Sequence, residues 1–141
     1  MDESLPTKLE LHVVTPEREV VAEQTMSVSL PGKSGRLGIL PGHAPLVSEL
    51  ANGVLFFEHA GQTKFLAVHG GFTEVLPGRV TVLAPAAEPA EAIDVNRAER
   101  AKQKAEEELH QPSSPEAQSG EAQEALERAR ARIEAAGHKT Q

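Results

Sequence analysis

Hydrophobic and polar residues alternate with a period of two through most of the first 89 positions. In the first run, Leu9, Leu11 and Val13 alternate with polar side chains. Such alternation places one face of a β-strand in a core and the other in water. Further runs, each ending near Pro or Gly, are residues 26–30, 54–57, 64–68, 71–76 and 79–83. Short strands with one polar face and closely spaced turns predict an antiparallel β-sandwich.

A helical period replaces this alternation after Pro89. Asp94 follows Ile93 and is a predicted N-cap, because its carboxylate can accept the free amide hydrogens of a first helical turn. Two apolar stripes with spacings of three and four follow: Ala98, Ala101, Ala105 and Leu109, then Ala122, Leu126, Ala129, Ile133 and Ala136. Pro112 and Pro115 interrupt the pattern, since proline cannot continue a helix. The second helix is expected to begin at Glu116 or Glu121 and to stop near Gly137. We predict an antiparallel two-helix hairpin.

Composition changes at the same place as the period. Nine of the eleven glycines and eight of the ten prolines lie within residues 1–89. The predicted fold class is therefore α+β, with a β-sandwich over residues 1–88 and a helical hairpin over residues 89–141. Alanine buries little area, and burial contributes roughly 25 cal/mol per Å². The hairpin is expected to be marginal alone and mobile.

Overall composition narrows the classes of function. The chain has 141 residues, a net charge of -7, no cysteine, and four Phe as its only aromatic residues besides histidine. It therefore has no disulfide or thiolate chemistry, and a nucleic-acid partner is not expected. The acidic start of the chain lacks the apolar run of a signal peptide, and no stretch approaches the roughly 20 apolar residues of a membrane span. We expect a soluble chain that meets a membrane only through a partner.

Catalytic and metal motifs do not emerge from the residue spacing. Gly32, Lys33 and Ser34 resemble the end of a phosphate loop, but the glycine required five positions earlier is Ser27. The six histidines have no recognised metal-ligand spacing, so we interpret them as surface or hydrogen-bonded loop residues and predict no metal site. Nothing marks a catalytic nucleophile. An enzyme is not predicted.

A segment rich in glycine and proline spans residues 31–45. Its composition predicts a fixed, folded-back loop between strands. Two interpretations stay open. The loop is either a purely structural crossover or a rigid docking surface that presents Leu37, Ile39 and Leu40.

Cationic side chains recur on both predicted helices. Arg97, Arg100 and Lys104 share one face of the first, and Arg128 and Arg132 share one face of the second. Folding the hairpin would set these cations opposite each other, which is unfavourable without an intervening anion. A bound polyphosphate would resolve the conflict. The alternative is that the side chains extend into water or pair with nearby carboxylates, namely Glu99, Glu106, Glu127 and Glu134.

Several short motifs follow one another along the chain. They are residues 35–46 (GRLGILPGHAPL), 53–55, 68–75 (VHGGFTEV), 79–84 (RVTVLA), 87–88 and 93–98 (IDVNRA). With these motifs in this order, the sequence resembles the epsilon subunit of bacterial and chloroplast-type rotary ATP synthases over nearly its whole length.

This resemblance implies a non-catalytic rotor subunit of the central stalk of a proton-translocating complex. The sandwich would bind the gamma subunit and the c-ring. The mobile hairpin would extend into the alpha/beta catalytic head and inhibit ATP hydrolysis through Arg128, Arg130 and Arg132. The complex would place the chain at the cytoplasmic face of the bacterial inner membrane as a peripheral subunit. The implied rotor contact loop comprises Gly35, Leu37, Gly38, Ile39, Leu40, Pro41, Gly42 and His43.

Some members of that family bind ATP in the folded hairpin, which implies a regulatory ligand and no obligatory cofactor. The matching positions are Glu88, Ile93, Asp94, Arg97, Ala98, Lys104, Arg128 and Arg132. Lys104 stands where an ATP-binding relative has arginine, so it offers a point charge instead of a fork. The competing hypotheses are a stand-alone β-sandwich module whose helices mediate self-association, and a small hydrolase, for which no motif exists.

Overall fold

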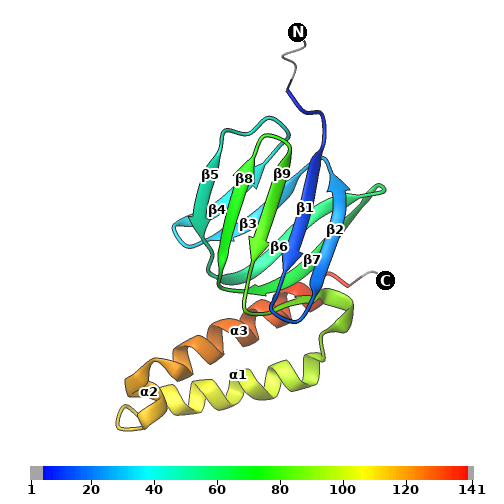
Figure 1. Cartoon of the computed structure of the whole chain (residues 1–141). Coiled ribbons are helices and arrows are strands. Elements are labelled where there is room, and N and C mark those ends of the chain that lie inside the picture. The colour runs from blue at the N-terminus through cyan, green and yellow to red at the C-terminus, as the bar shows by residue number, and fades with distance from the viewer. Residues whose placement is uncertain (1–4, 140–141) are drawn as a thin grey trace.

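The computed structural model describes residues 5–139 as a two-layered β-sandwich with a helical hairpin at one end (Figure 1). The strands of the sandwich are β1 (Leu9–Val14), β2 (Glu19–Thr25), β3 (Val28–Gly32), β4 (Gly35–Ile39), β5 (Leu46–Glu49), β6 (Asn52–His59), β7 (Gln62–His69), β8 (Phe72–Leu76), β9 (Arg79–Leu83) and β10 (Ala87–Pro89). One sheet has the order β2-β1-β9-β8-β5, and the other has the order β10-β7-β6-β3-β4. The predicted fold class is confirmed.

The inner faces of the two sheets form the main core. Leu9, Leu11 and Val13 of β1 are fully buried, as their alternation predicts. The same holds for Val80 and Val82 of β9, which pair with Leu11 and Val13. Burial of such branched aliphatic side chains from both sheets is the main stabilising contribution to a sandwich.

Two features of the sheets differ from the sequence-based prediction. Strand β9 pairs with β1 in parallel, with Leu11 opposite Val80, so the first sheet is mixed. Strands β2, β4, β5 and β10 were not predicted. The segment 31–45 is not a loop throughout, because Gly35–Ile39 pairs with β3 as an edge strand. Only residues 40–45 form an irregular connection between strands.

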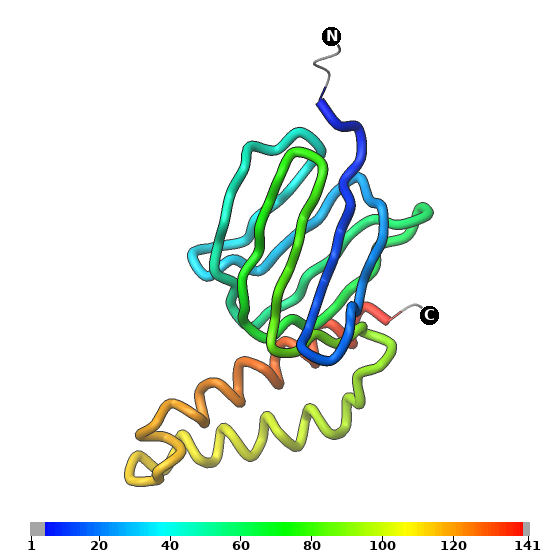
Figure 2. Tube along the Cα trace, viewed as in Figure 1, coloured from blue at the N-terminus to red at the C-terminus, as the bar shows by residue number. Residues whose placement is uncertain are grey.

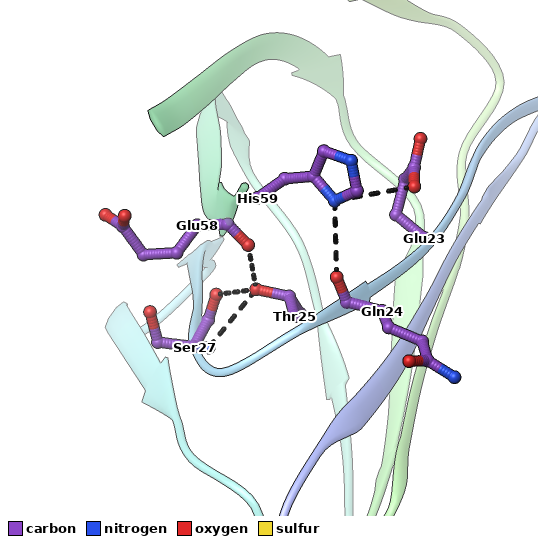
Figure 3. A network of polar contacts seen from close by, with 6 residues as sticks. All are labelled: Glu23, Gln24, Thr25, Ser27, Glu58 and His59. Carbon is purple, nitrogen blue, oxygen red and sulfur yellow. Dashed lines mark hydrogen bonds and ion pairs between the residues drawn. The ribbon is translucent and has the colours of Figure 1, made fainter. Parts of the chain in front are cut away.

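A buried threonine ties the turn between β2 and β3 to the end of β6 (Figure 3). The Thr25 hydroxyl lies 2.6 Å from the carbonyl oxygen of Glu58 and 2.9 Å from that of Ser27. A hydroxyl has one proton, so it donates to one of these oxygens at a time while it accepts from the amide of Ser27 at 3.2 Å. The chain is thereby held where it crosses from one sheet to the other.

The helical part comprises the 3₁₀ turn η1 (Ala90–Ala92), α1 (Val95–Leu109), the short α2 (Pro115–Ser119) and α3 (Glu121–Ala136). Asp94 caps α1 as predicted, since its carboxylate accepts from the amide of Arg97 at 3.1 Å. The second helix was expected to begin at Glu116 or at Glu121. The structure has a helix near each position, since α2 begins at Pro115 and α3 at Glu121, and Gly120 at φ +85° separates the two. That left-handed conformation favours glycine.

Helix α3 lies between α1 and the second sheet (Figures 1 and 2). Its C-terminal half contacts the sheet through Ala131 and Ala135, which pack against Val54 and Ala67. The end of the hairpin at α2 projects beyond the sandwich (Figure 2). Within the described residues, no helix combines the length and the hydrophobicity that crossing a bilayer requires.

Candidate functional site

A pocket of about 410 Å³ lies where β10, the start of α1 and α3 meet. Its position explains why residues distant in sequence line it. Strand β10 brings in one carboxylate, the first two turns of α1 provide a second carboxylate and a guanidinium, and α3 contributes another guanidinium. The lining residues are Glu88, Ala92, Asp94, Arg97, Ala98, Ala101 and Arg132.

An ion pair in this pocket joins the sandwich to the hairpin. The Arg132 Nε donates to both carboxylate oxygens of Glu88, at 2.9 and 3.2 Å. About 30% of each side chain is exposed, so water screens the pair only in part. Hydrogen bonds between charged groups are stronger than neutral ones, and this pair therefore helps to fix α3 on the sheet.

A buried imidazole lies behind the same carboxylate. His69, at the end of β7, is 5% exposed, and its Nε2 is 3.3 Å from the Glu88 Oε1. Among the described residues neither ring nitrogen has a well-formed hydrogen-bond partner, so this contact is close but poorly aligned. We expected all six histidines to be surface or hydrogen-bonded loop residues, and for His69 that interpretation is wrong.

These neighbours lower the pKa of Glu88 from 4.5 to about 2. The adjacent His69 is the largest cause, and the hydrogen bonds and positive charge of Arg132 act in the same direction, whereas burial opposes them. The imidazole acts by its proximity, 3.3 Å from the carboxylate, and both neighbours favour the ionised form of Glu88.

The charges that surround the pocket balance. Glu88 and Asp94 are carboxylates, and Arg97 and Arg132 are guanidiniums. Of the two alternatives, pairing with a carboxylate holds for Arg132, although its partner Glu88 was not among the four expected glutamates. An incoming phosphate would have to compete with Glu88 for Arg132, while Arg97 has no acidic partner within ion-pair distance among the described residues.

The structure divides the predicted nucleotide-binding residues. Glu88, Asp94, Arg97, Ala98 and Arg132 come together in the pocket. Ile93 is buried beneath it, 4% exposed, in the cluster that seats α3.

Lys104 and Arg128 do not join that group. They line a separate, open depression of about 840 Å³ toward the end of the hairpin, among several glutamates. Arg128 pairs there with Glu124 at 3.3 Å, a partner that was not among the four expected glutamates. Arg100 is exposed and lines neither cavity.

The predicted rotor contact loop is also divided. Ile39 is 1% exposed and belongs to the core, so it cannot be part of a docking surface. Leu40, in contrast, is 62% exposed. The connection 40–45 lies at the end of the sandwich opposite the hairpin (Figure 1). The remaining predicted positions, Gly35, Leu37, Gly38, Pro41, Gly42 and His43, are exposed or partly exposed.

Two contacts at the end of α3 were missed by the sequence reasoning. The Lys139 Nζ donates to the carbonyl oxygen of Ile93 at 2.8 Å, next to the N-cap of α1. The His138 ring stacks on Phe65 of β7 with the ring centroids 4.0 Å apart. No sequence signal marks either contact, since both partners become neighbours only when the hairpin folds back. Residues 5–139 contain no cluster of three potential metal ligands.

Comparison with known protein families agrees with this two-part architecture. Residues 8–90 match the family model described as "ATP synthase, Delta/Epsilon chain, beta-sandwich domain". Residues 91–137 match the model described as "ATP synthase, Delta/Epsilon chain, long alpha-helix domain". The chain belongs to the ATP synthase delta/epsilon family. The boundary between the two matches falls in η1, so the pocket is lined from both family domains.

Individual relatives give the same result. The ATP synthase epsilon chain of Koribacter versatilis is 52% identical over 107 residues, which cover 76% of this chain and 75% of that one. The epsilon chain of Bacillus pumilus is 43% identical over 129 residues, covering 92% and 97%. Among solved structures, a chain of the Euglena gracilis mitochondrial ATP synthase, described as OSCP/F1/c-ring, superposes with a TM-score of 0.83 at 28% identity. That superposition covers 98% of this chain and 86% of the other.

Proposed function

We propose that the chain is the non-catalytic epsilon-type subunit in the central stalk of a bacterial proton-translocating ATP synthase. Residues 1–88 would form its rotor-docking domain and residues 89–141 its regulatory hairpin. The observation that carries this proposal is the match of both segments, in order, to the two family domains. A match across both segments favours this role over a stand-alone module whose helices mediate self-association.

The outer surface of the sandwich supports a role in docking. Strands β5, β8 and β9 alternate so that the apolar residues Val47, Phe72, Leu76 and Leu83 face outward and are exposed. Phe72 and Leu83 are cross-strand neighbours, so these two side chains adjoin on that face. Exposed apolar patches of this kind mark protein interfaces. We assign this face to the gamma subunit and the exposed connection 40–43 to the c-ring.

The hairpin would act as the brake on ATP hydrolysis. Its folded position depends on a small apolar interface rich in alanine, one partly exposed ion pair, one ring stack and a few hydrogen bonds, so an extended position is within reach of a few kcal/mol. Release would free Arg132 from Glu88 and present it, together with Arg128 and Arg130, to the alpha/beta catalytic head. The complex would hold the chain at the cytoplasmic face of the bacterial inner membrane as a peripheral subunit.

Reconstitution of the catalytic head with gamma and this chain tests the brake. Bound chain is expected to lower ATP hydrolysis, and Arg130→Ala is expected to relieve the inhibition in part. Arg130 is exposed in the folded hairpin, so its removal leaves the isolated chain unchanged. Arg100→Ala, an exposed arginine of α1, is the matched control. Equal relief by both substitutions, or a chain that does not bind gamma, would refute the assignment.

ATP would be a regulatory ligand that holds the hairpin folded. The pocket of about 410 Å³ is in the range of small-ligand sites. Arg97 and Arg132 project into it from two different helices, so a polyphosphate would bridge α1 and α3. Binding would then stabilise the folded hairpin by mass action.

Calorimetric titration of ATP into the isolated chain tests this ligand. Saturable binding is expected, with loss of at least tenfold in affinity in Arg97→Ala because a charge-assisted hydrogen bond is removed. Arg100→Ala should bind like the wild type, and Arg128→Ala should lose less than Arg97→Ala, since Arg128 lies outside the pocket. If no binding is seen at millimolar ATP, the role as a rotor subunit would still hold, but ATP would be rejected as its regulatory ligand.

A further inference from the structure

His69 is the buried ionisable group that the proposed rotor and brake functions leave unexplained. It is 5% exposed at the end of β7, and neither ring nitrogen has a well-formed hydrogen-bond partner among the described residues. Buried polar atoms almost always find partners, because an unpaired one costs about 1–3 kcal/mol. A histidine in this position therefore needs a physical reason.

One carboxylate lies within ion-pair distance of the ring, and Glu124, Glu127 and Arg128 line a cavity that His69 also borders. Its cross-strand neighbour Asn52 directs its amide to Glu127 at 3.3 Å instead. The backbone amide of His69 donates to the carbonyl oxygen of Ala86, which brings β10 alongside the ring. Glu88, two residues further along that strand, then lies with its Oε1 3.3 Å from the His69 Nε2.

We propose that His69 is a positioning residue for the junction between the sandwich and the hairpin. Its Nε2 lies 3.3 Å from the Glu88 Oε1, and a proton donated from Nε2 to that oxygen would hold the carboxylate toward Arg132, so that α3 docks onto a fixed acceptor. The geometry favours this role because the imidazole lies behind the carboxylate while the guanidinium approaches from α3. Small rotations of the ring or of the carboxylate would align the hydrogen bond that the distance already allows.

The proposal is independent of any nucleotide. It concerns how the empty hairpin stays folded, and it holds whether or not the pocket binds ATP. It also assigns the proton of the imidazole to Nε2, because that nitrogen faces an acceptor. A proton on Nδ1 instead would set a lone pair against the carboxylate.

A two-dye fluorescence assay on the isolated full chain measures the effect without nucleotide. The chain has no cysteine, so Gln62→Cys on β7 and Gln123→Cys on α3 provide two unique labelling sites, both exposed. Energy transfer between the dyes then reports the fraction of folded hairpin. His69→Leu removes the donor, whereas His69→Gln keeps an N–H at the corresponding position without the ring.

His69→Leu is expected to shift the equilibrium toward the released hairpin about tenfold, since it removes support from a charged acceptor. His69→Gln should stay within about twofold of the wild type. In a Glu88→Met background, His69→Leu should have no further effect, because the residue acts through Glu88. The same loss in both backgrounds, or equal loss in the leucine and glutamine variants, would refute the proposal.

Nitrogen NMR of the wild-type chain provides a second test that needs no substitution at His69. The expected spectrum shows a proton on Nε2. The opposite tautomer would overturn the assignment even if the leucine variant failed to fold.

Discussion

The sandwich and the hairpin of this chain are built from different kinds of contact. The sandwich core consists of fully buried leucines and valines, such as Leu11, Leu55 and Val80, contributed by strands far apart in sequence. The two long helices meet mainly through alanines, among them Ala98 and Ala129. Apolar burial contributes roughly 25 cal/mol per Å², so a leucine contributes several times as much as an alanine.

Under the proposed function, this difference would separate a rigid platform from an element that can be released. Removing the hairpin from the sheet would expose a few alanines, two partly buried phenylalanines and the pair of Glu88 with Arg132. Opening the sandwich would expose its whole core. A protein that must keep one part attached while another part moves needs this inequality between its two interfaces.

The largest effect is expected in the sandwich core. Leu55→Ala should lower the free energy of unfolding by about 2–5 kcal/mol, because the fully buried side chain leaves a cavity that neighbouring strands cannot fill. Urea denaturation followed by circular dichroism measures the loss. Val47→Ala, at a side chain that is 71% exposed, should change the same quantity by less than about 0.5 kcal/mol.

A smaller effect should appear on the hairpin alone. Ala135 is fully buried between α3 and the sheet, and Ala135→Leu should weaken docking by about 1–3 kcal/mol through overpacking. The two-dye assay should show release of α3 while the denaturation midpoint of the sandwich is retained. Glu134→Leu, on the exposed side of α3, is the control. Unfolding of both parts together would contradict the separation of the two interfaces.

Acid should release the hairpin through Glu88. The pKa of Glu88 is lowered from 4.5 to about 2 in the folded chain, mainly by His69 on the same sheet and in addition by Arg132 of α3. The stabilisation that Arg132 contributes to docking is therefore present in full above pH 4.5 and is lost as the pH falls toward 2. We expect about a tenfold change in the folded-to-released ratio across this window. The two-dye assay should show this dependence flattened in Glu88→Gln and retained in Glu91→Gln, which changes an exposed carboxylate nearby.

The smallest effect concerns the end of α3. Lys139→Ala removes the hydrogen bond to the Ile93 carbonyl oxygen and should weaken docking by about 1 kcal/mol. Hydrogen exchange at the last turn of α3 measures the local opening. Protection should fall there several-fold while the amides of β6 and β7 stay unchanged. A global loss of protection would show that this contact supports the whole fold instead.

Local sequence patterns predicted those elements whose buried face or cap is set by residues close in sequence. The alternation around Leu11 and the cap at Asp94 are of this kind, and both are confirmed. Edge strands such as β4 and β5 escaped prediction, because a strand with one neighbour and several glycines or exposed side chains carries little alternation. The burial of Ala131 and Ala135 on a second face of α3 was not predicted. Alanines occur on several sides of this helix, so the sequence does not indicate which side is buried.

The candidate site shows the same limit. The resemblance to epsilon subunits grouped Glu88, Asp94, Arg97 and Arg132, and the structure brings these four residues together in one pocket. The same reasoning also grouped Lys104 and Arg128 with them, and the structure places these two in another depression. Helical spacing gives the face of a side chain, but not how far along a hairpin the opposing helix sets its partner.

The sequence by itself determined an α+β chain with a strand-rich half, a capped helical hairpin and a weak alanine interface, because each depends on the period of residues close in sequence. Only the tertiary structure decided the parallel pairing of β1 with β9, the burial of His69 and the contact of Glu88 with Arg132. Each of these joins residues separated by tens of positions. Their proximity follows from the packing of two sheets and a folded hairpin, which no local pattern encodes.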